Sequence, residues 1–232
     1  MSRLPAELRG LGRWEEALAQ TDDPLARAEL LNEWALFAGD EDAHARAGDE
    51  LARAEALTAL GRGRLLHAQF LAERKEDPRE LELFERALEL ARSLGDRHLE
   101  AQALFWVGLV HQVVRGNSPA SQRSFQDSYD YALELGDTLT QSYAARHLGF
   151  VELEAGHADA SWARFEESVE LRRADGFLPG VAAGLLTLGE VAAAAGRVEE
   201  ARTLLLEARA LAEQVGAEPF LRRIEEALAE LP

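Results

Sequence analysis

Glycines recur at a fixed interval of about 40 residues along most of this 232-residue chain. Successive members of one series are 41, 40 and 40 residues apart, and the series consists of Gly95, Gly136, Gly176 and Gly216. A second series has two intervals of 40 residues and consists of Gly116, Gly156 and Gly196. Helices commonly end at a residue in the left-handed conformation, which glycine adopts without steric cost. Two interleaved series with one period therefore predict a repeating unit of helix, turn, helix and turn.

The residue types between these glycines favour helices throughout. Ala, Leu, Glu and Arg dominate the sequence, and all four are strong helix formers. Valine is sparse and Ile224 is the single isoleucine, so a sizeable β-sheet would lack its usual residues. We therefore predict an all-α protein.

The helix boundaries follow from capping patterns. Asp23-Pro24, Asp77-Pro78 and Ser118-Pro119 each place a capping side chain before proline at the first helical position, and Glu80 completes a capping-box pattern after Asp77. One or two short helices are expected within 4–20. The longer helices are expected near 23–38, 41–60, 63–75, 78–94, 97–115, 118–135, 138–155, 158–174, 178–195, 198–214 and 218–230.

Small and large residues also recur within each period. The first helix of a pair carries Gly108, Gly149 or Gly189, and the second carries Phe125, Phe165 or Leu205. A glycine inside a helix costs about 1 kcal/mol relative to alanine. Three glycines at equivalent positions therefore indicate that the two helices of each pair pack too closely for a side chain.

This pattern resembles the tetratricopeptide repeat, in a form with about 40 residues per repeat. The last clear copy reads Leu185, Leu188, Gly189, Ala192, Ala201, Leu205 and Ala208. The match is good over 63–216 and weaker over 23–61, with Leu31-Asn32 and then Ala68 where Leu-Gly is expected. Residues 1–20 match only through GRWEEAL (12–18), which echoes GRVEEAR (196–202).

The resemblance implies antiparallel helix pairs stacked into a right-handed superhelix. On this interpretation residues 1–232 form one solenoid domain. Residues 1–22 are a degenerate first repeat, 23–216 are the repeats, and 217–232 are a C-terminal capping helix. One face of the final helix, 219–231, is apolar, which suits a cap, and a dimerisation helix is the alternative.

The resemblance also implies a concave groove that binds a peptide or helix of a partner protein. Carried over position by position, the groove residues are Phe105, Leu109, Gln112, Arg146, Phe150, Leu153, Leu186, Glu190 and Ala193. Tyr143 lies one turn before Arg146 and is expected on the same face. The alternative is that some of these side chains only pack against the next repeat. Lysine and asparagine are absent from these positions, which argues against the carboxylate clamp of chaperone-binding members.

Several classes of chemistry lack their sequence signals. The chain has no cysteine, which excludes disulfides and thiolate sites. No nucleotide-binding, zinc-protease or serine-hydrolase motif occurs. Glu41 and His44, and Glu154 and His157, have the spacing of a di-iron motif, but Gly156 interrupts the second pair. We therefore expect no enzyme activity, no metal and no cofactor.

The formal net charge of −17 disfavours direct binding to nucleic acid or to anionic membranes. The N-terminal segment lacks the apolar run of a signal peptide, and no apolar stretch could cross a bilayer. We expect a cytoplasmic monomer or homodimer that acts as an interaction scaffold for a protein or peptide. The alternative is a sensor of a small ligand or peptide that regulates a transcriptional or signalling partner in trans.

Overall fold

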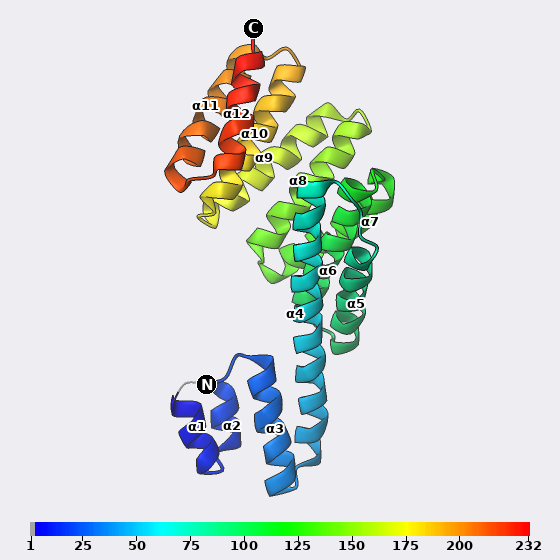
Figure 1. Ribbon diagram of the computed structural model, residues 1–232, viewed down its shortest axis with the longest axis vertical. Coiled ribbons are helices and arrows are strands. Elements are labelled where there is room, and N and C mark those ends of the chain that lie inside the picture. Colours follow the sequence, from blue (N-terminus) through cyan, green and yellow to red (C-terminus); the bar gives the residue numbers. More distant parts are fainter. Residues whose placement is uncertain (1–2) are drawn as a thin grey trace. The chain divides into compact units, whose positions relative to one another are not determined.

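The computed structural model of the protein describes residues 3–232. In this part of the chain it contains twelve α-helices, one π-helical turn and no strand (Figure 1). Most helices that follow each other in the sequence pack against each other. The predicted all-α fold is therefore confirmed.

Most helices begin and end within two residues of the positions expected from the sequence. The early helices are α1 (Arg3–Gly10), α2 (Trp14–Ala19), α3 (Pro24–Ala38), α4 (Glu41–Glu73) and α5 (Arg79–Leu94). The later helices are α6 (Arg97–Leu109), the π-helical turn η1 (Val110–Val114), α7 (Ser118–Leu135), α8 (Thr138–Glu154), α9 (Ala158–Ala174), α10 (Leu178–Ala194), α11 (Val198–Val215) and α12 (Glu218–Glu230).

The chain divides into two compact units, Met1–Ala103 and Leu104–Pro232. In the first unit, Leu30 and Leu31 of α3 pack with Leu8, Leu18 and small residues of α4. In the second unit, Leu185, Leu205 and Ile224 centre a core shared by α9, α10, α11 and α12. Each unit thus has an apolar core of its own.

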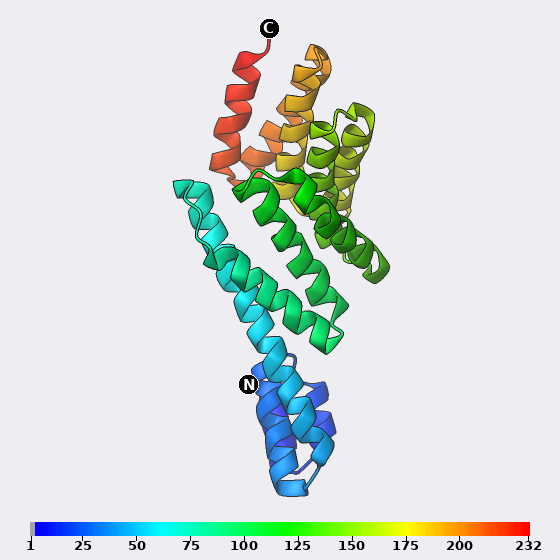
Figure 2. The same ribbon diagram turned by 90° about the vertical axis from the view of Figure 1, so that its right-hand side faces the viewer.

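Helix α4 corrects the sequence prediction of two helices, 41–60 and 63–75. It is one continuous helix of 33 residues, with Gly61 and Gly63 in its interior. Helix α3 packs on its first half and α5 on its second half (Figures 1 and 2). Neither glycine is followed by proline, so the chain can remain helical, and packing on both halves offsets their low helix propensity.

The glycines of the two series all lie in turns and have positive φ angles, between 62° and 83°. Gly12, in the echoed N-terminal phrase, has the same conformation at φ 70°. The left-handed conformation predicted for these positions is therefore confirmed.

The single interval of 41 residues has a structural counterpart. Gly108 and Gly116 are eight residues apart, whereas Gly149 and Gly156 are seven apart, as are the corresponding glycines of the next pair. The π-helical turn η1 lies between Gly108 and Gly116. A π-helical turn holds one more residue than an α-helical turn, so we infer that η1 absorbs the additional residue.

One of the three predicted N-caps is confirmed, and two differ. Asp23 caps α3 as expected, since its Oδ1 accepts a hydrogen bond from Ala26 N at 2.8 Å. Helix α7 is capped by Asn117 instead of Ser118. Helix α5 begins at Arg79, one residue later than predicted, and Glu80 forms no capping box, because its side chain is buried.

The interior glycines are contact points between paired helices. A Cβ atom on Gly108 would lie 2.8 Å from the ring of Phe125, and one on Gly149 would lie 2.6 Å from the ring of Phe165. On Gly189 it would lie 2.7 Å from Leu205. The close packing predicted at these three glycines is therefore confirmed.

The same contact occurs once more in α4, which corrects the repeat alignment. A Cβ on Gly63 would lie 2.5 Å from the ring of Phe84. Gly63, and not Ala68, therefore occupies the equivalent position in this pair, and Ala68 is exposed. The loop between α4 and α5, which is longer than the three-residue turns between later paired helices, obscured this equivalence in the sequence.

Two glycines of α4 provide a matched test of this packing. We expect Gly63→Ala to destabilise the protein by about 1–3 kcal/mol, because the added methyl group overlaps Phe84. Gly61→Ala should instead stabilise it by up to about 1 kcal/mol, because Gly61 is exposed and an added Cβ would have no neighbour within 4 Å. Urea unfolding followed by circular dichroism measures both changes, and the same sign for both variants would contradict the assignment.

Candidate partner-binding face

Five of the residues expected in the groove lie together on the second unit. Tyr143, Arg146 and Phe150 are partly exposed on α8, and Glu190 is exposed on the neighbouring helix α10. Leu153, one turn after Phe150, is 37% exposed. We call the surface formed by these five side chains the α8–α10 face.

Three other expected groove residues are core residues. Phe105 is 5% exposed, Leu109 is 6% exposed and Leu186 is 1% exposed. The ring of Phe105 lies 5.9 Å from that of Phe125 and 5.5 Å from that of Tyr143, measured between centroids. In this structure these three side chains pack within the unit and offer almost no surface to a partner.

The remaining two expected residues differ from each other. Gln112, in η1, donates a hydrogen bond from Nε2 to the backbone oxygen of His147 at 3.1 Å, and its Oε1 lies 2.6 Å from His147 Nδ1. Gln112 therefore joins η1 to α8. Ala193 is partly exposed near the end of α10.

Arg146 connects α8 to α10 across the face. One of its Nη atoms donates a hydrogen bond to Thr187 Oγ1 at 3.0 Å, and its guanidinium lies 4.8 Å from the centroid of the Phe150 ring. Its Nε is buried and has no hydrogen-bond partner among the described residues. Burial and the nearby charges of Arg172 and Arg223 lower the pKa of Arg146 to about 10, against the opposing effect of Glu190.

A second arginine lies beneath this face. Arg172, on α9, is 2% exposed, and its guanidinium lies 5.0 Å from the centroid of the Tyr143 ring. Its Nη1 donates to the backbone oxygen of Gly180 at 2.9 Å, where a Cβ on Gly180 would lie 2.9 Å from Arg172 Cδ. Burial lowers the pKa of Arg172 to about 10. Both arginines therefore remain charged at neutral pH.

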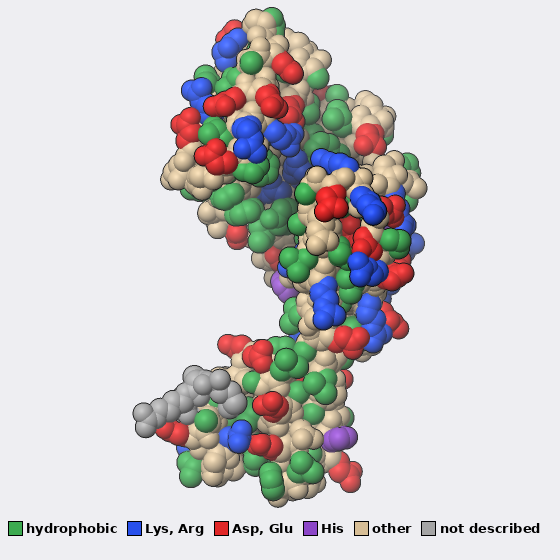
Figure 3. All heavy atoms as spheres, in the orientation of Figure 1, with side chains coloured by type: hydrophobic (Ala, Val, Ile, Leu, Met, Phe, Trp, Pro, Cys, Tyr) green, Lys and Arg blue, Asp and Glu red, His purple; other side chains and the backbone are tan. Residues whose placement is uncertain are grey.

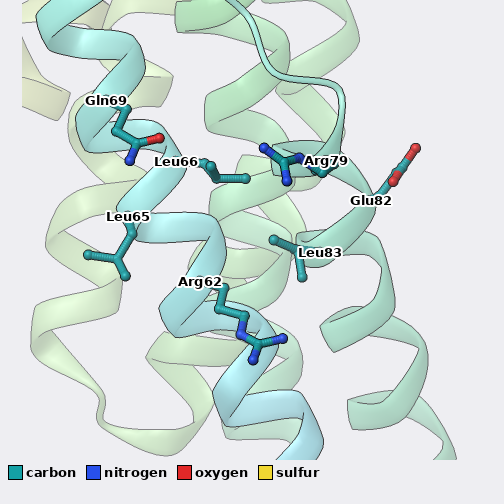
Figure 4. A pocket seen from close by; sticks show the side chains of 7 residues that line it. All are labelled: Arg62, Leu65, Leu66, Gln69, Arg79, Glu82 and Leu83. Atoms are coloured by element: carbon teal, nitrogen blue, oxygen red, sulfur yellow. The ribbon is translucent and has the colours of Figure 1, made fainter.

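The first unit has a separate open pocket of about 570 Å³ between α4 and α5 (Figure 4). Leu65, Leu66 and Leu83 form its apolar part. Its polar lining residues are Arg62, Gln69, Arg79 and Glu82. No residue of this pocket was expected to be functional from the sequence.

A buried polar pair lies between the same two helices. His67 Nδ1 lies 2.8 Å from Glu80 Oε1, and the second carboxyl oxygen of Glu80 is buried without a hydrogen-bond partner among the described residues. Burial raises the pKa of Glu80, and the nearby carboxylates of Glu76 and Asp77 act in the same direction, whereas the hydrogen bond to His67 lowers it. Glu80 occupies the position of the small residues Ser121 and Ser161 in later pairs.

Exposed apolar side chains on the first unit were also missed from the sequence. Leu36 is 71% exposed and Phe37 is 79% exposed, both at the end of α3. A helix that is apolar on every side is normally buried. The run Trp34-Ala35-Leu36-Phe37 covers every side of the helix end, so the exposure of Leu36 and Phe37 is the reverse of what this pattern indicates.

Neither pair with the di-iron spacing lies in a cluster of potential metal ligands among the described residues. His157 precedes α9 and its Nδ1 lies 2.7 Å from Glu152 Oε2. Within residues 3–232, no three His, Asp or Glu side chains are grouped so that they could hold a metal ion. No described helix is both long enough and apolar enough to cross a bilayer.

The comparisons with known proteins add no identification. The sequence matches no protein-family model and no curated protein. The structure therefore defines the class of protein only by its architecture. In the described residues it is all-helical, and most consecutive helices pack on one another.

The burial of Phe105 gives a direct prediction. We expect Phe105→Ala to lower the free energy of unfolding by about 3–5 kcal/mol, because it leaves a cavity beside Phe125 and Tyr143. Leu153→Ala, on the exposed part of α8, should change it by less than about 1 kcal/mol. Urea unfolding tests both, and a similar small effect of the two variants would show that Phe105 is not a core residue.

The raised pKa of Glu80 predicts a pH-dependent stability. Above pH 4.5, the ordinary pKa of this carboxyl, the unfolded chain loses the proton first, so the folded state is progressively disfavoured until the higher folded pKa is passed. The stability of the wild-type protein relative to Glu80→Gln should therefore fall as the pH rises above about 5, through the raised folded pKa. Urea unfolding at several pH values measures this difference, and a difference that is constant or rises with pH would contradict the raised pKa.

Proposed function

We propose that the protein is a non-enzymatic interaction scaffold of the tetratricopeptide type, acting in the cytoplasm. Its α8–α10 face would hold a peptide or helix of a partner protein. The observation that carries this proposal is the combination, on one face, of partly exposed Tyr143 and Phe150 with the cation Arg146, which forms no ion pair within the described chain. Aromatic and arginine side chains contribute most of the binding energy at many protein interfaces.

The regularity of the second unit supports the tetratricopeptide interpretation. Its helix pairs have a 40-residue period, left-handed glycine turns and an interior glycine packed against Phe or Leu. A right-handed superhelix of stacked pairs belongs to the same proposal.

Burial of apolar surface on the α8–α10 face would by itself give a partner peptide little affinity. Burial of about 300 Å² of apolar surface would stabilise a complex by about 7 kcal/mol, and association costs about 4–15 kcal/mol. Apolar contacts with Tyr143, Phe150 and Leu153 would therefore need a polar anchor in addition.

The proposal is tested with two matched variants and a soluble affinity tag. We expect Leu153→Glu, on the α8–α10 face, to reduce recovery of a co-purifying partner at least about fivefold, because it puts a charge into an apolar contact. Leu206→Glu, on α11, has a similar exposure of 42% and should leave recovery unchanged. Quantitative mass spectrometry of the captured proteins measures this, and a partner lost equally in both variants would refute the assignment of the face.

A second candidate is a ligand sensor that acts in trans on another protein. The pocket between α4 and α5 favours it, because three leucines beside arginine and amide groups suit a small amphipathic ligand. A thermal-shift screen of metabolites against the wild-type protein and Leu66→Arg would distinguish the two candidates, since a ligand of this pocket would raise the melting temperature of the wild type alone.

A further inference from the structure

Positive charge exceeds negative charge around Arg146, although the formal net charge of the protein is −17. Arg146 and Arg172 form no ion pair with any carboxylate of the described chain, and their hydrogen-bond acceptors are the neutral groups of Thr187, Ser142 and Gly180. Figure 3 shows several Lys or Arg side chains close together on the second unit, near α12. Excess positive charge is therefore concentrated at one place.

Glu190 is the carboxylate that acts on this group of arginines. Arg223, on α12, donates to Glu190 Oε1 at 3.1 Å. Glu190 also raises the pKa of Arg146, while Arg172 and Arg223 lower it. The guanidinium groups of Arg146 and Arg223 therefore share the charge of Glu190. That carboxylate is exposed on α10.

The burial of these cations is costly unless an anion compensates for it. Removing a charged group from water is unfavourable without a partner of opposite charge. The Nε of Arg146 is buried and has no acceptor among the described residues. The residue as a whole is nevertheless partly exposed, and Nε is the one atom of its guanidinium that is buried without a partner among the described residues.

We propose that Arg146 and Arg223 bind a carboxylate of the partner peptide, with Arg172 contributing positive charge from beneath. This inference names the anchor of the proposed partner-binding face and rests on that proposed function for the identity of the ligand as a peptide. The carboxylate belongs to an Asp or Glu side chain or to a peptide C-terminus. Tyr143 and Phe150 pack against the apolar residues beside it.

The surrounding acidic surface does not prevent this binding. At physiological salt the Debye length is about 8 Å, so carboxylates farther than that from Arg146 are largely screened. Arginine is also suited to a carboxylate, because its planar donors match the two oxygens. The nearby arginines therefore outweigh the net charge of the chain at the site.

Small anions test the cationic site independently of any partner. In ¹H–¹⁵N spectra, we expect sodium acetate to shift the Nε–Hε signals of Arg146 and Arg172 saturably, whereas sodium chloride at the same ionic strength should not. Glu190→Gln removes the competing carboxylate and should tighten acetate binding about two- to fivefold. Arg146→Gln should abolish the saturable shift of the Arg172 signal.

The matched control is Arg209→Gln on α11. The side chain of Arg209 is 43% exposed, and among the described residues it pairs only with Glu213 of its own helix, at 3.7 Å. This variant should bind acetate as the wild-type protein does. The absence of saturable shifts up to about 50 mM acetate, or binding weakened by Glu190→Gln, would overturn the proposed site. Inorganic phosphate that binds at least tenfold more tightly than acetate would overturn the assignment to a carboxylate.

Peptides then identify the source of the carboxylate. The probe is the acetylated and amidated pentapeptide Ala-Leu-Glu-Phe-Ala, compared with its Gln counterpart and with the Gln counterpart carrying a free C-terminus. We expect at least one of the two carboxylate peptides to bind at least fivefold more tightly than the neutral one, with the difference lost in Arg146→Gln. Equal binding of all three peptides would refute the carboxylate anchor but not the α8–α10 face. If acetate binds and partner recovery is unchanged by Leu153→Glu, the α8–α10 face is refuted and the anion site is not.

Discussion

The contact between an interior glycine and a large apolar side chain determines how the paired helices of this protein pack. It occurs between Gly63 and Phe84, Gly108 and Phe125, Gly149 and Phe165, and Gly189 and Leu205. In each case a single Cβ atom would approach the partner side chain to less than 3 Å. The helix axes can therefore come close only where the side chain is absent, and this offsets the cost of about 1 kcal/mol for each glycine in a helix. The positions of the aromatic rings, and of the polar groups around them, follow from these contacts.

One of these pairs differs in its buried chemistry. In later pairs the residue four positions before the large side chain is Ser121, Ser161 or Ala201, each with 0% exposure. In the first pair it is Glu80, and His67 supplies the hydrogen bond that a buried carboxyl requires. The spacing of Glu80 from Asp77 predicts a capping box, and this prediction is wrong. Packing against α4 overrides the local pattern, and that packing is not visible in a segment of sequence taken by itself.

The α8–α10 face depends on the same packing in a different way. Gly180 of α10 leaves room for Phe177 and for Arg172 of α9, so this cation can lie beneath Tyr143. Arg146 and Phe150 were expected on the face from the position of Gly149, and the structure places them side by side. Phe105, Leu109 and Leu186 were expected there by the same rule, but the neighbouring side chains bury them. A positional rule thus identifies one side of a helix, whereas exposure depends on how closely the next helix approaches.

The sequence alone determined the helical content, the 40-residue period and the left-handed turns, because these depend on helix propensity and on the conformational freedom of glycine, which are local properties. It also contained the additional residue between Gly108 and Gly116, which the structure accommodates as a π-helical turn. Only the tertiary structure decided that α4 is continuous, that Gly63 is equivalent to the later interior glycines, and that two arginines of the second unit lack carboxylate partners among the described residues. These features arise from contacts between side chains distant in the sequence, and no local preference specifies which of them meet.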